Sequence, residues 1–487
     1  MPVLNAIIVL KLSLTRGEAF YAYAVALFLF ILNALPVFAD DNKPGTLAPP
    51  IPNIDAMAAR MKNYQDTYRQ IRDDSLAAFV KAHPNVPVNN EIKAFMGITA
   101  YLGVWGDFYG EGLWSQGSRI AESIMSKAIP EWQANMFLQE DRLGSSHSSV
   151  DSDAQYINFA ALKLVETNYP FELKMQGCAT ALGNLVNYKT ESNGDPNGNS
   201  FKSVPYLFKA WGDGYHQMIK GKFSHEQLDD AGANLLCVCQ NDEKMLNLAI
   251  AQIDEVFNES DSSNPVKLAL DGQYFVSAAW CARGSGWASS VTDAGWQHFK
   301  ERLAKADDIL ETAYAKYPAE GEIARSMIDV ELGQGQGRDR MEMWFQRAIK
   351  ANPDDYAAYK GKEWYLQPRW YGSVEDIVSF GKECMKTGNW AAKIPMIFPT
   401  SIAEASDQDS TLYSRDDIWQ PLEEVYREYL SHYPQSVNYR TWFAKHAADG
   451  GHLDVAREQF KILGSDWDHA VLSESDYADL IAKINSK

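Results

Sequence analysis

The chain has 487 residues, of which 46% are hydrophobic and 22% are charged. This length exceeds what one compact core needs, and the composition is that of a folded protein rather than a disordered one. The formal net charge of -19 repels phosphate backbones and anionic membrane surfaces, so we expect no nucleic-acid partner and no membrane attachment through surface charge.

The first 39 residues have the order of a secretory signal peptide. Lys11 and Arg16 precede an apolar run from Ala19 to Leu32, and Val37-Phe38-Ala39 provides a cleavage position. We therefore expect export to the periplasm or the extracellular space. The alternative is an uncleaved anchor that holds the body outside the cytoplasm, because the apolar segment nearly spans a bilayer. In either case, membrane contact is expected only through this N-terminal segment.

Residues 40–52 separate this segment from the folded body. The four prolines of DDNKPGTLAPPIP favour an extended, stiff linker over a packed element. Further on, the polar run NESDSSNP at residues 258–265 marks a domain boundary. We expect an α-helical N-terminal domain over residues 53–264 and a second region over residues 265–487.

Apolar residues at helical spacing run through the N-terminal domain. From Met57 to Val80 they recur at intervals of three and four residues, which places them on one stripe of a helix. Similar patterns occur at residues 118–127, 154–166, 171–186, 224–239 and 243–257. Ser224 with Gln227 predicts a capping box at the start of one of these helices. No stretch of the sequence alternates as a strand does, so the sequence predicts an all-α fold.

One segment of this domain combines aromatic residues with two carboxylates. Trp105, Tyr109 and Trp114 interleave with Asp107 and Glu111 in YLGVWGDFYGEGLW. Aromatic platforms beside a carboxylate pair suit sugar binding, and glycoside cleavage needs two carboxyl groups that flank one bond. We favour the structural alternative, because carboxylates four residues apart can lie on one helical face, and glycines with aromatic residues often mark a close helix crossing.

The second region shows the period of tetratricopeptide units. Such a unit is a helix pair of about 34 residues with small residues where the helices cross, an aromatic residue on the second helix and a proline after it. Three stretches match: Ala306, Leu310, Ala313 and Pro318 in the first, Phe345, Ala348 and Pro353 in the second, and Gly451, Leu453, Ala456 and Phe460 in the third. The sequence therefore predicts helix pairs stacked as a tetratricopeptide-like α-solenoid behind the N-terminal helical domain.

Four strings between Arg283 and Leu463 also carry a family resemblance. They are Arg283-Gly284-Ser285-Gly286-Trp287, Glu331-Leu332-Gly333-Gln334-Gly335, Trp344-Phe345-Gln346-Arg347-Ala348 and Leu366-Gln367-Pro368-Arg369-Trp370-Tyr371-Gly372-Ser373. Together they resemble the domain of unknown function DUF4034, a bacterial family of exported or membrane-associated proteins with tetratricopeptide-like helices. The resemblance covers less than half of the chain. It implies helix pairs that present a surface to a partner, and it implies no catalytic residues.

The last of these strings predicts a tight turn between two helices. Pro368 ends the first helix, Gly372 permits a left-handed turn, and Ser373 with Asp376 caps the second helix.

Two residues of this turn are candidates for a ligand or partner surface. Arg369 beside Trp370 can stack on an acidic or aromatic ligand. We favour the alternative that Trp370 wedges between repeats.

The remaining motifs predict no metal site and no cofactor. The nine histidines form no His-Glu-x-x-His pattern, and the five cysteines form no paired CxxC pattern. The glycine-rich run at residues 333–337 lacks the Lys-Ser/Thr of a nucleotide-binding loop and is interpreted as a turn between helices. We therefore expect a non-catalytic scaffold of the cell envelope that binds a protein or peptide. The alternative is a carbohydrate-active enzyme or glycan-binding protein that uses the segment from Trp105 to Trp114.

Overall fold

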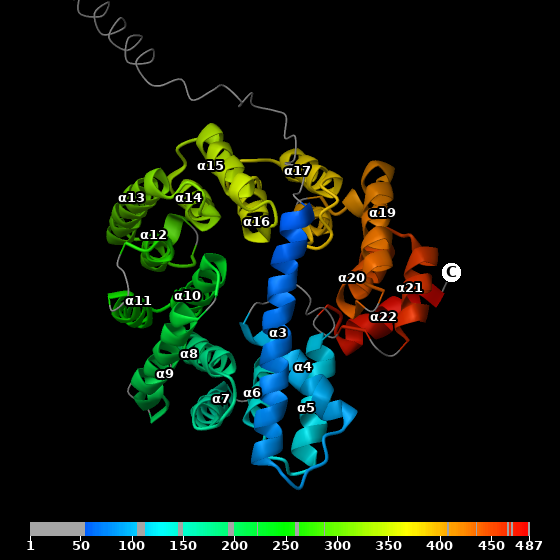
Figure 1. The fold of residues 1–487 in the computed structure, drawn as a ribbon. Helices are drawn as coiled ribbons and strands as arrows, with labels where there is room; N and C mark the ends of the chain where they lie inside the picture. The colour runs from blue at the N-terminus through cyan, green and yellow to red at the C-terminus, as the bar shows by residue number, and fades with distance from the viewer. Residues whose placement is uncertain are drawn as a thin grey trace, which may run out of the picture. The chain divides into compact units, whose positions relative to one another are not determined.

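The computed structural model describes residues 54–104, 113–144, 150–192, 199–221, 223–258, 263–286, 288–406, 409–434, 436–464, 467–468 and 471–485. Within these residues the chain forms 20 α-helices, α3 to α22, and no strand, so the all-α prediction is confirmed for them (Figure 1). All of these helices belong to the unit Pro49–Lys487. The predicted signal segment and proline-rich linker lie outside the described residues.

The helices follow one another with short connections. The first are α3 (Ile54–Ala82), α4 (Asn90–Val104), α5 (Leu113–Ser126), α6 (Trp132–Gly144), α7 (Val150–Val165), α8 (Phe171–Ser192), α9 (Val204–Lys220), α10 (His225–Cys239) and α11 (Glu243–Asn258). Next come α12 (Pro265–Arg283), α13 (Asp293–Lys316), α14 (Gly321–Gln334), α15 (Arg338–Ala351), α16 (Tyr356–Tyr365), α17 (Val374–Lys386) and α18 (Ile397–Ser406). The last are α19 (Asp416–His432), α20 (Val437–Asp449), α21 (Leu453–Leu463) and α22 (Glu474–Asn485). In the described connections lie four short 3-10 helices: η1 (Asn199–Ser203), η2 (Ala288–Ser290), η3 (Ile394–Met396) and η4 (Leu412–Ser414).

The six helices predicted in the N-terminal region correspond to α3, α5, α7, α8, α10 and α11. The predicted capping box at the start of α10 is present. Ser224 Oγ accepts a hydrogen bond from the Gln227 backbone N–H at 3.2 Å, and Gln227 Oε1 accepts one from the Ser224 N–H at 3.0 Å. These two bonds satisfy amides that the first turn of the helix leaves without partners.

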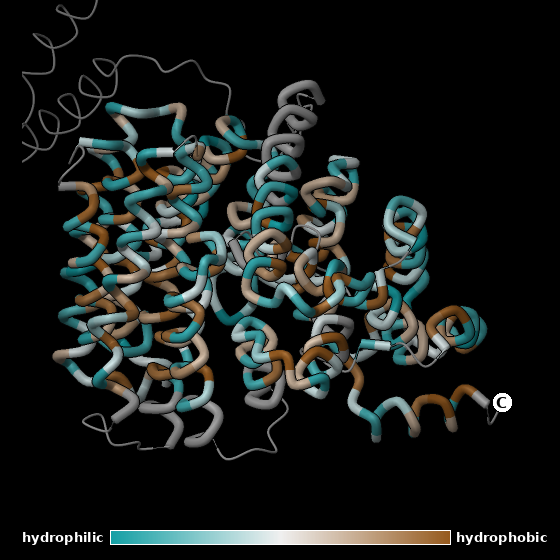
Figure 2. Tube along the Cα trace, turned by 60° about the horizontal axis from the view of Figure 1, so that its bottom comes forward, coloured by the Kyte–Doolittle hydropathy of each residue, from teal (hydrophilic) through white to brown (hydrophobic). Residues whose placement is uncertain are grey.

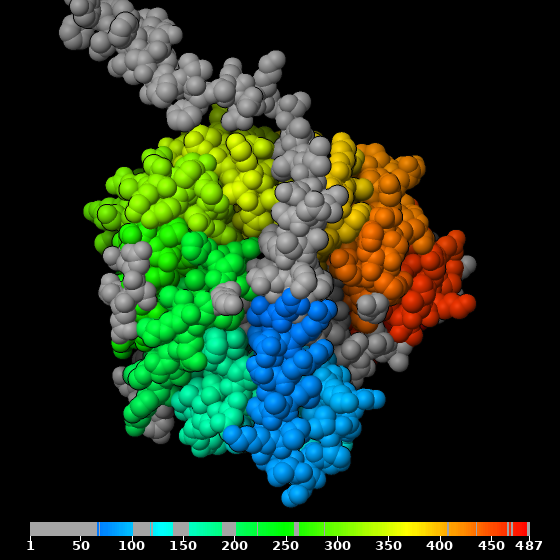
Figure 3. Space-filling model, in the orientation of Figure 1, coloured from blue at the N-terminus to red at the C-terminus, as the bar shows by residue number. Residues whose placement is uncertain are grey.

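Neighbouring helices pack in pairs, such as α6 with α7, α12 with α13, α14 with α15 and α20 with α21. α3 packs along α4 (Figure 3). Along the helices, hydrophobic and hydrophilic residues alternate, as expected for helices that bury one face (Figure 2).

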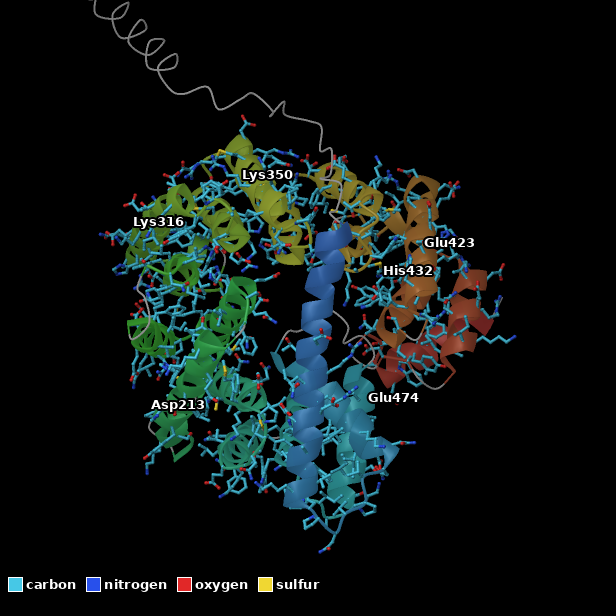
Figure 4. All side chains as sticks on the ribbon, in the orientation of Figure 1. Asp213, Lys316, Lys350, Glu423, His432 and Glu474 are labelled. Atoms are coloured by element: carbon cyan, nitrogen blue, oxygen red, sulfur yellow. The ribbon has the colours of Figure 1, made fainter. Side chains whose placement is uncertain are left out.

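A second set of contacts links every other helix. α8 contacts α10, and the same relation continues from α10 to α12, from α12 to α14, from α14 to α16 and from α16 to α18. We call these helices the even-numbered row. The odd-numbered helices pack chiefly on the row and lie at the outer side, as the labelled residues Asp213, Lys316, Lys350 and Glu423 of α9, α13, α15 and α19 show (Figure 4).

The core explains why the predicted repeat positions hold small and apolar residues. Ala306, Leu310 and Ala313 of α13 are buried, as are Phe345 and Ala348 of α15. In the third repeat, Ala456 and Phe460 of α21 are buried as well.

One close helix contact depends on a glycine. A Cβ atom added to Gly272 of α12 would overlap with the side chain of Leu310, so α13 approaches α12 closely at this point.

The turn after α16 is present, but the role predicted for Gly372 is wrong. This residue does not belong to the glycines with positive φ. A Cβ at this position would instead overlap with the backbone carbonyl of Leu366, so a close approach of two backbone segments requires the glycine. The cap prediction is confirmed, because Ser373 Oγ accepts a hydrogen bond from the Asp376 N–H at 3.1 Å.

Candidate functional site

The aromatic and acidic segment of the N-terminal domain cannot be placed in the structure. Trp105, Asp107, Tyr109 and Glu111 lie outside the described residues, and Trp114 lies in α5 with a side chain that is not described. Their proposed role in glycan binding or cleavage stays a prediction.

The structure gives Arg369 and Trp370 different partners. The Arg369 guanidinium carbon lies 4.0 Å from the ring centroid of Trp364, and an Arg369 nitrogen lies 3.8 Å from a Glu404 oxygen. Trp370 packs edge-to-face on Trp280 of α12, with ring centroids 5.7 Å apart. Arg369 is therefore at the surface, whereas Trp370 connects the turn to α12.

Three of the strings that carry the family resemblance lie next to one another. The Tyr371 hydroxyl donates a hydrogen bond to the Leu332 carbonyl at 3.1 Å, which ties the turn to the C-terminal end of α14. Trp280, in contact with Trp370, also lies below the guanidinium of Arg283 at 5.6 Å. The turn after α16 thus covers the C-terminal ends of α12 and α14.

A charged cluster lies at the other ends of the helices of the even-numbered row, away from this turn. Arg325 Nη2 of α14 donates a hydrogen bond to Asp229 Oδ2 of α10 at 2.6 Å, and Arg325 Nη1 lies 3.7 Å from Asp355 Oδ1 at the start of α16. Gln273 Nε2 of α12 donates to both oxygens of Asp229, at 3.1 and 3.2 Å. One guanidinium and one amide therefore hold a carboxylate that is almost completely buried.

Further acidic residues surround this ion pair. We call the following residues the Arg325 cluster: Arg325, Glu226, Asp229, Asp230, Glu322, Asp329 and Asp355. Five of these carboxyl groups interact with the one guanidinium, and Glu226 joins the cluster through Asp230. Sequence analysis did not single out any of them, because they lie on helices far apart in the chain.

Burial sets the protonation of the cluster. It raises the pKa of Asp229, although the charge of Arg325 and the bond from Gln273 act in the other direction. Burial and the charge of Asp229 together raise the pKa of Glu322 to about 8, and burial raises the pKa of Asp230 well above its ordinary value. Part of the cluster therefore holds protons at neutral pH, which limits the repulsion among its carboxyl groups.

The cluster is partly open to solvent. The side chain of Asp329 is exposed, and those of Asp230 and Arg325 are partly exposed. Surrounding protein nevertheless raises the pKa of Asp329 to about 6. A ligand could therefore reach these carboxyl groups.

The even-numbered row bends toward this surface. α10 and α14 flank α12, and helix axes spaced 8–10 Å apart would place them about 16–20 Å apart in a flat row. Figure 1 shows the helices of the row on an arc, and the 2.6 Å contact between Arg325 and Asp229 joins α14 to α10 across one face of α12. The adjoining loops converge too, since Asn352 Nδ2 donates to Glu226 Oε1 at 3.2 Å.

The described part of the chain contains neither a candidate metal site nor a candidate membrane-spanning helix. Among these residues, no group of three or more His, Cys, Asp or Glu side chains is arranged to hold a metal. Within the same residues, no helix combines the length and the apolar character needed to cross a membrane.

No protein-family model matches the chain, and no curated protein matches it. The resemblance to DUF4034 stays a prediction that rests on the four strings.

Proposed function

We propose that the chain is an exported, non-catalytic scaffold that binds a protein or peptide on the open face of its even-numbered row. In this proposal the helix pairs form a tetratricopeptide-like α-solenoid, preceded by an N-terminal helical domain. The contacts along the even-numbered row and its bend over α12 support this arrangement, because stacked helix pairs with one closely packed row form a concave surface.

The Arg325 cluster is the observation that carries the proposal. Buried and half-buried carboxylates are usually paired with cations, because an unpaired charge away from water is costly. Here five carboxyl groups, Asp229, Asp230, Glu322, Asp329 and Asp355, interact with one guanidinium on a surface where Asp329 is exposed. A partner segment that carries lysine or arginine would provide the missing positive charge, so we expect the partner to present a basic segment.

Affinity capture from an envelope extract tests the proposal. The full chain is used as bait, the captured protein is identified by mass spectrometry, and its affinity is measured again with both purified proteins. We expect Asp329→Lys, which reverses an exposed charge of the cluster, to weaken binding at least about tenfold, or about 1.4 kcal/mol.

The matched control is Asp213→Lys on α9, where the exposed side chain forms an ion pair with Lys209 of the same helix. It makes the same change in net charge on the outer side of the helices (Figure 4). Equal affinities for the two variants, with either no loss or the same loss, would refute binding on the even-numbered row.

The alternative function, a carbohydrate-active enzyme or glycan-binding protein, depends on the segment from Trp105 to Trp114 and stays a prediction.

A further inference from the structure

Two arginines lie among tryptophans where the turn after α16 covers the C-terminal ends of α12 and α14. The guanidinium carbon of Arg283 lies 5.6 Å from the ring centroid of Trp280 and 5.5 Å from that of Trp296, so this cation interacts with two indole rings. Trp280 also contacts Trp370, which follows Arg369 in the chain. We call the following residues the tryptophan–arginine surface: Trp280, Arg283, Trp296, Trp364, Arg369 and Trp370.

One side of the Arg283 guanidinium has no partner among the described residues. Nη1 donates hydrogen bonds to the carbonyls of Gly284 and Gly286, at 3.0 and 3.1 Å. Within the described part of the chain, no carboxylate forms an ion pair with Arg283, and no acceptor is bound to its Nε or Nη2. These two nitrogens form the side of a guanidinium that can hold a carboxylate through two parallel hydrogen bonds. The bonds of Nη1 fix the orientation of the group, so a carboxylate that binds here need not order it first.

Arg369 presents the end of its guanidinium instead. Its Nε donates to Gln367 Oε1 at 2.6 Å, and its guanidinium carbon lies 4.0 Å from the ring centroid of Trp364. Glu404 is its ion-pair partner among the described residues, but the two groups are 3.8 Å apart, which is too far for a hydrogen bond. The Arg369 side chain is 53% exposed, so its two terminal nitrogens can receive a carboxylate from outside the chain.

Arg427 of α19 shows, by comparison, a guanidinium whose sides are both occupied. Its Nε donates to Glu423 at 2.8 Å, and its two terminal nitrogens donate to the two oxygens of Glu458 at 3.1 and 2.9 Å. Carboxylates are abundant in this chain, which has a formal net charge of -19. Arginines that keep a side free in such a chain are complementary in charge to a carboxylate of another molecule.

The aromatic residues of the turn suit contact with a protein segment. Tryptophan, tyrosine and arginine are enriched among the side chains that dominate the binding energy of protein interfaces. Trp364 is 36% exposed, and Tyr371 of the same turn is 43% exposed. The hydrogen bond from Tyr371 to the Leu332 carbonyl holds the turn in place. An extended segment could therefore lie on these rings while its acidic side chains reach the two guanidinium groups.

We propose that the tryptophan–arginine surface binds an acidic segment of a partner protein, with one carboxylate on Arg369 and a second on Arg283. This inference goes beyond the proposed function, which places a basic segment at the other ends of the even-numbered row. A cation in the last turn of α12 is also favoured by the helix dipole without any ligand, so the test measures binding and stability separately.

Calorimetric titration of the full chain tests the inference. The probes are the capped heptapeptide Ser-Glu-Ser-Glu-Ser-Glu-Ser, the same peptide with glutamines in place of the glutamates, and a tetrasaccharide of galacturonic acid. Alternate residues of an extended peptide point to the same side, so the first probe offers its carboxylates on one face. We expect only this peptide to bind.

Three variants test the two guanidinium groups. Arg369→Gln and Arg283→Gln should each weaken peptide binding at least about tenfold. Arg369→Lys should weaken it at least about threefold, because lysine keeps the charge but not the paired N–H groups. Circular dichroism and the melting temperature show whether each variant is folded, and the exposed Arg369 decides the test if Arg283→Gln is unstable.

The matched control is Arg427→Gln, which makes the same substitution at an exposed arginine of α19 and should leave the affinity within about twofold. The inference is overturned if the glutamate peptide does not bind, if Arg369→Gln binds it as the wild type does, or if Arg427→Gln shows the same loss. Binding of the tetrasaccharide alone would assign the surface to an acidic glycan and would overturn the inference as well.

Discussion

Glu131 lies just before α6 with its side chain 1% exposed, and its Oε2 is 3.6 Å from Nε2 of His83. Burial raises the pKa of Glu131 from 4.5 to about 7 and lowers the pKa of His83. Between pH 4.5 and about pH 7, the folded state binds more protons at Glu131 than the unfolded state. The contribution of Glu131 to stability is therefore complete below about pH 4.5 and is lost as the pH rises to about 7.

At the residue scale we thus predict that Glu131→Gln stabilises the protein at about pH 8, because a neutral amide replaces a buried carboxylate. The shift corresponds to at most about 3 kcal/mol in the free energy of unfolding. Urea unfolding at about pH 5 and pH 8 measures it, and the variant should lose less stability over this range than the wild type. Glu166→Gln, at an exposed position, is the control and should follow the wild type. Equal losses in Glu131→Gln and the wild type would contradict the prediction.

At the scale of elements, the contact between α12 and α13 depends on the absence of a side chain at Gly272. Gly272→Ala would force Leu310 to move, and overpacking of this kind costs about 1–3 kcal/mol. In Gly361→Ala of α16, the new Cβ would lie 3.2 Å from Ile328 Cγ2, and the higher helix propensity of alanine offsets the crowding by up to about 1 kcal/mol. We predict a lower melting temperature for Gly272→Ala and little change for Gly361→Ala. Similar melting temperatures would show that the contact is not tight.

Sequence periodicity predicted some of the helices that bury a single stripe, but it missed α9, although Leu207, Trp211 and Tyr215 lie on such a stripe. α3 and α10 are of this kind, and the cap of α10 was visible as Ser224 and Gln227. α4 was missed because Phe95, Met96 and Ile98 are all buried, so its apolar residues follow no single stripe. The need for a glycine in the turn after α16 was predicted correctly, but the physical cause was not. A close contact between two backbone segments cannot be predicted from the local sequence.

At the scale of the whole molecule, Arg325 joins three helices of the even-numbered row. Arg325→Met would leave Asp229 and Asp355 without their guanidinium, and removal of one partner from a buried ion pair costs about 3–5 kcal/mol. We predict a larger loss at about pH 8 than at pH 5, because protonation of the carboxyl groups at low pH replaces the missing charge.

Chemical denaturation at both pH values measures the effect of Arg325→Met. Arg415→Met is the control, since its ion pair with Asp417 is exposed and screened by solvent and should contribute little to stability. A loss for Arg325→Met that is no larger than the loss for the control would show that the pair does not hold the helices together.

The Arg325 cluster shows the limit of prediction from sequence for this protein. The helix pairs of the second region were predicted from small residues and prolines that recur within one repeat. Asp229 and Arg325 meet through the stacking of several pairs, and a local pattern contains no information on which helices converge. Sequence analysis therefore selected aromatic residues near turns as candidate site residues. It did not find the charged residues of the Arg325 cluster.

Four carboxyl groups of the row also share a position along their helices. Glu172, Glu226 and Glu322 lie in the first turns of α8, α10 and α14, and Asp355 is the N-cap of α16. The aligned peptide dipoles of a helix place roughly half a positive charge at this end. Four such ends offset about two of the negative charges, so the field outside the row is weaker than its carboxyl groups alone would produce. The affinity for a basic segment should therefore depend less steeply on salt concentration than the number of carboxyl groups implies.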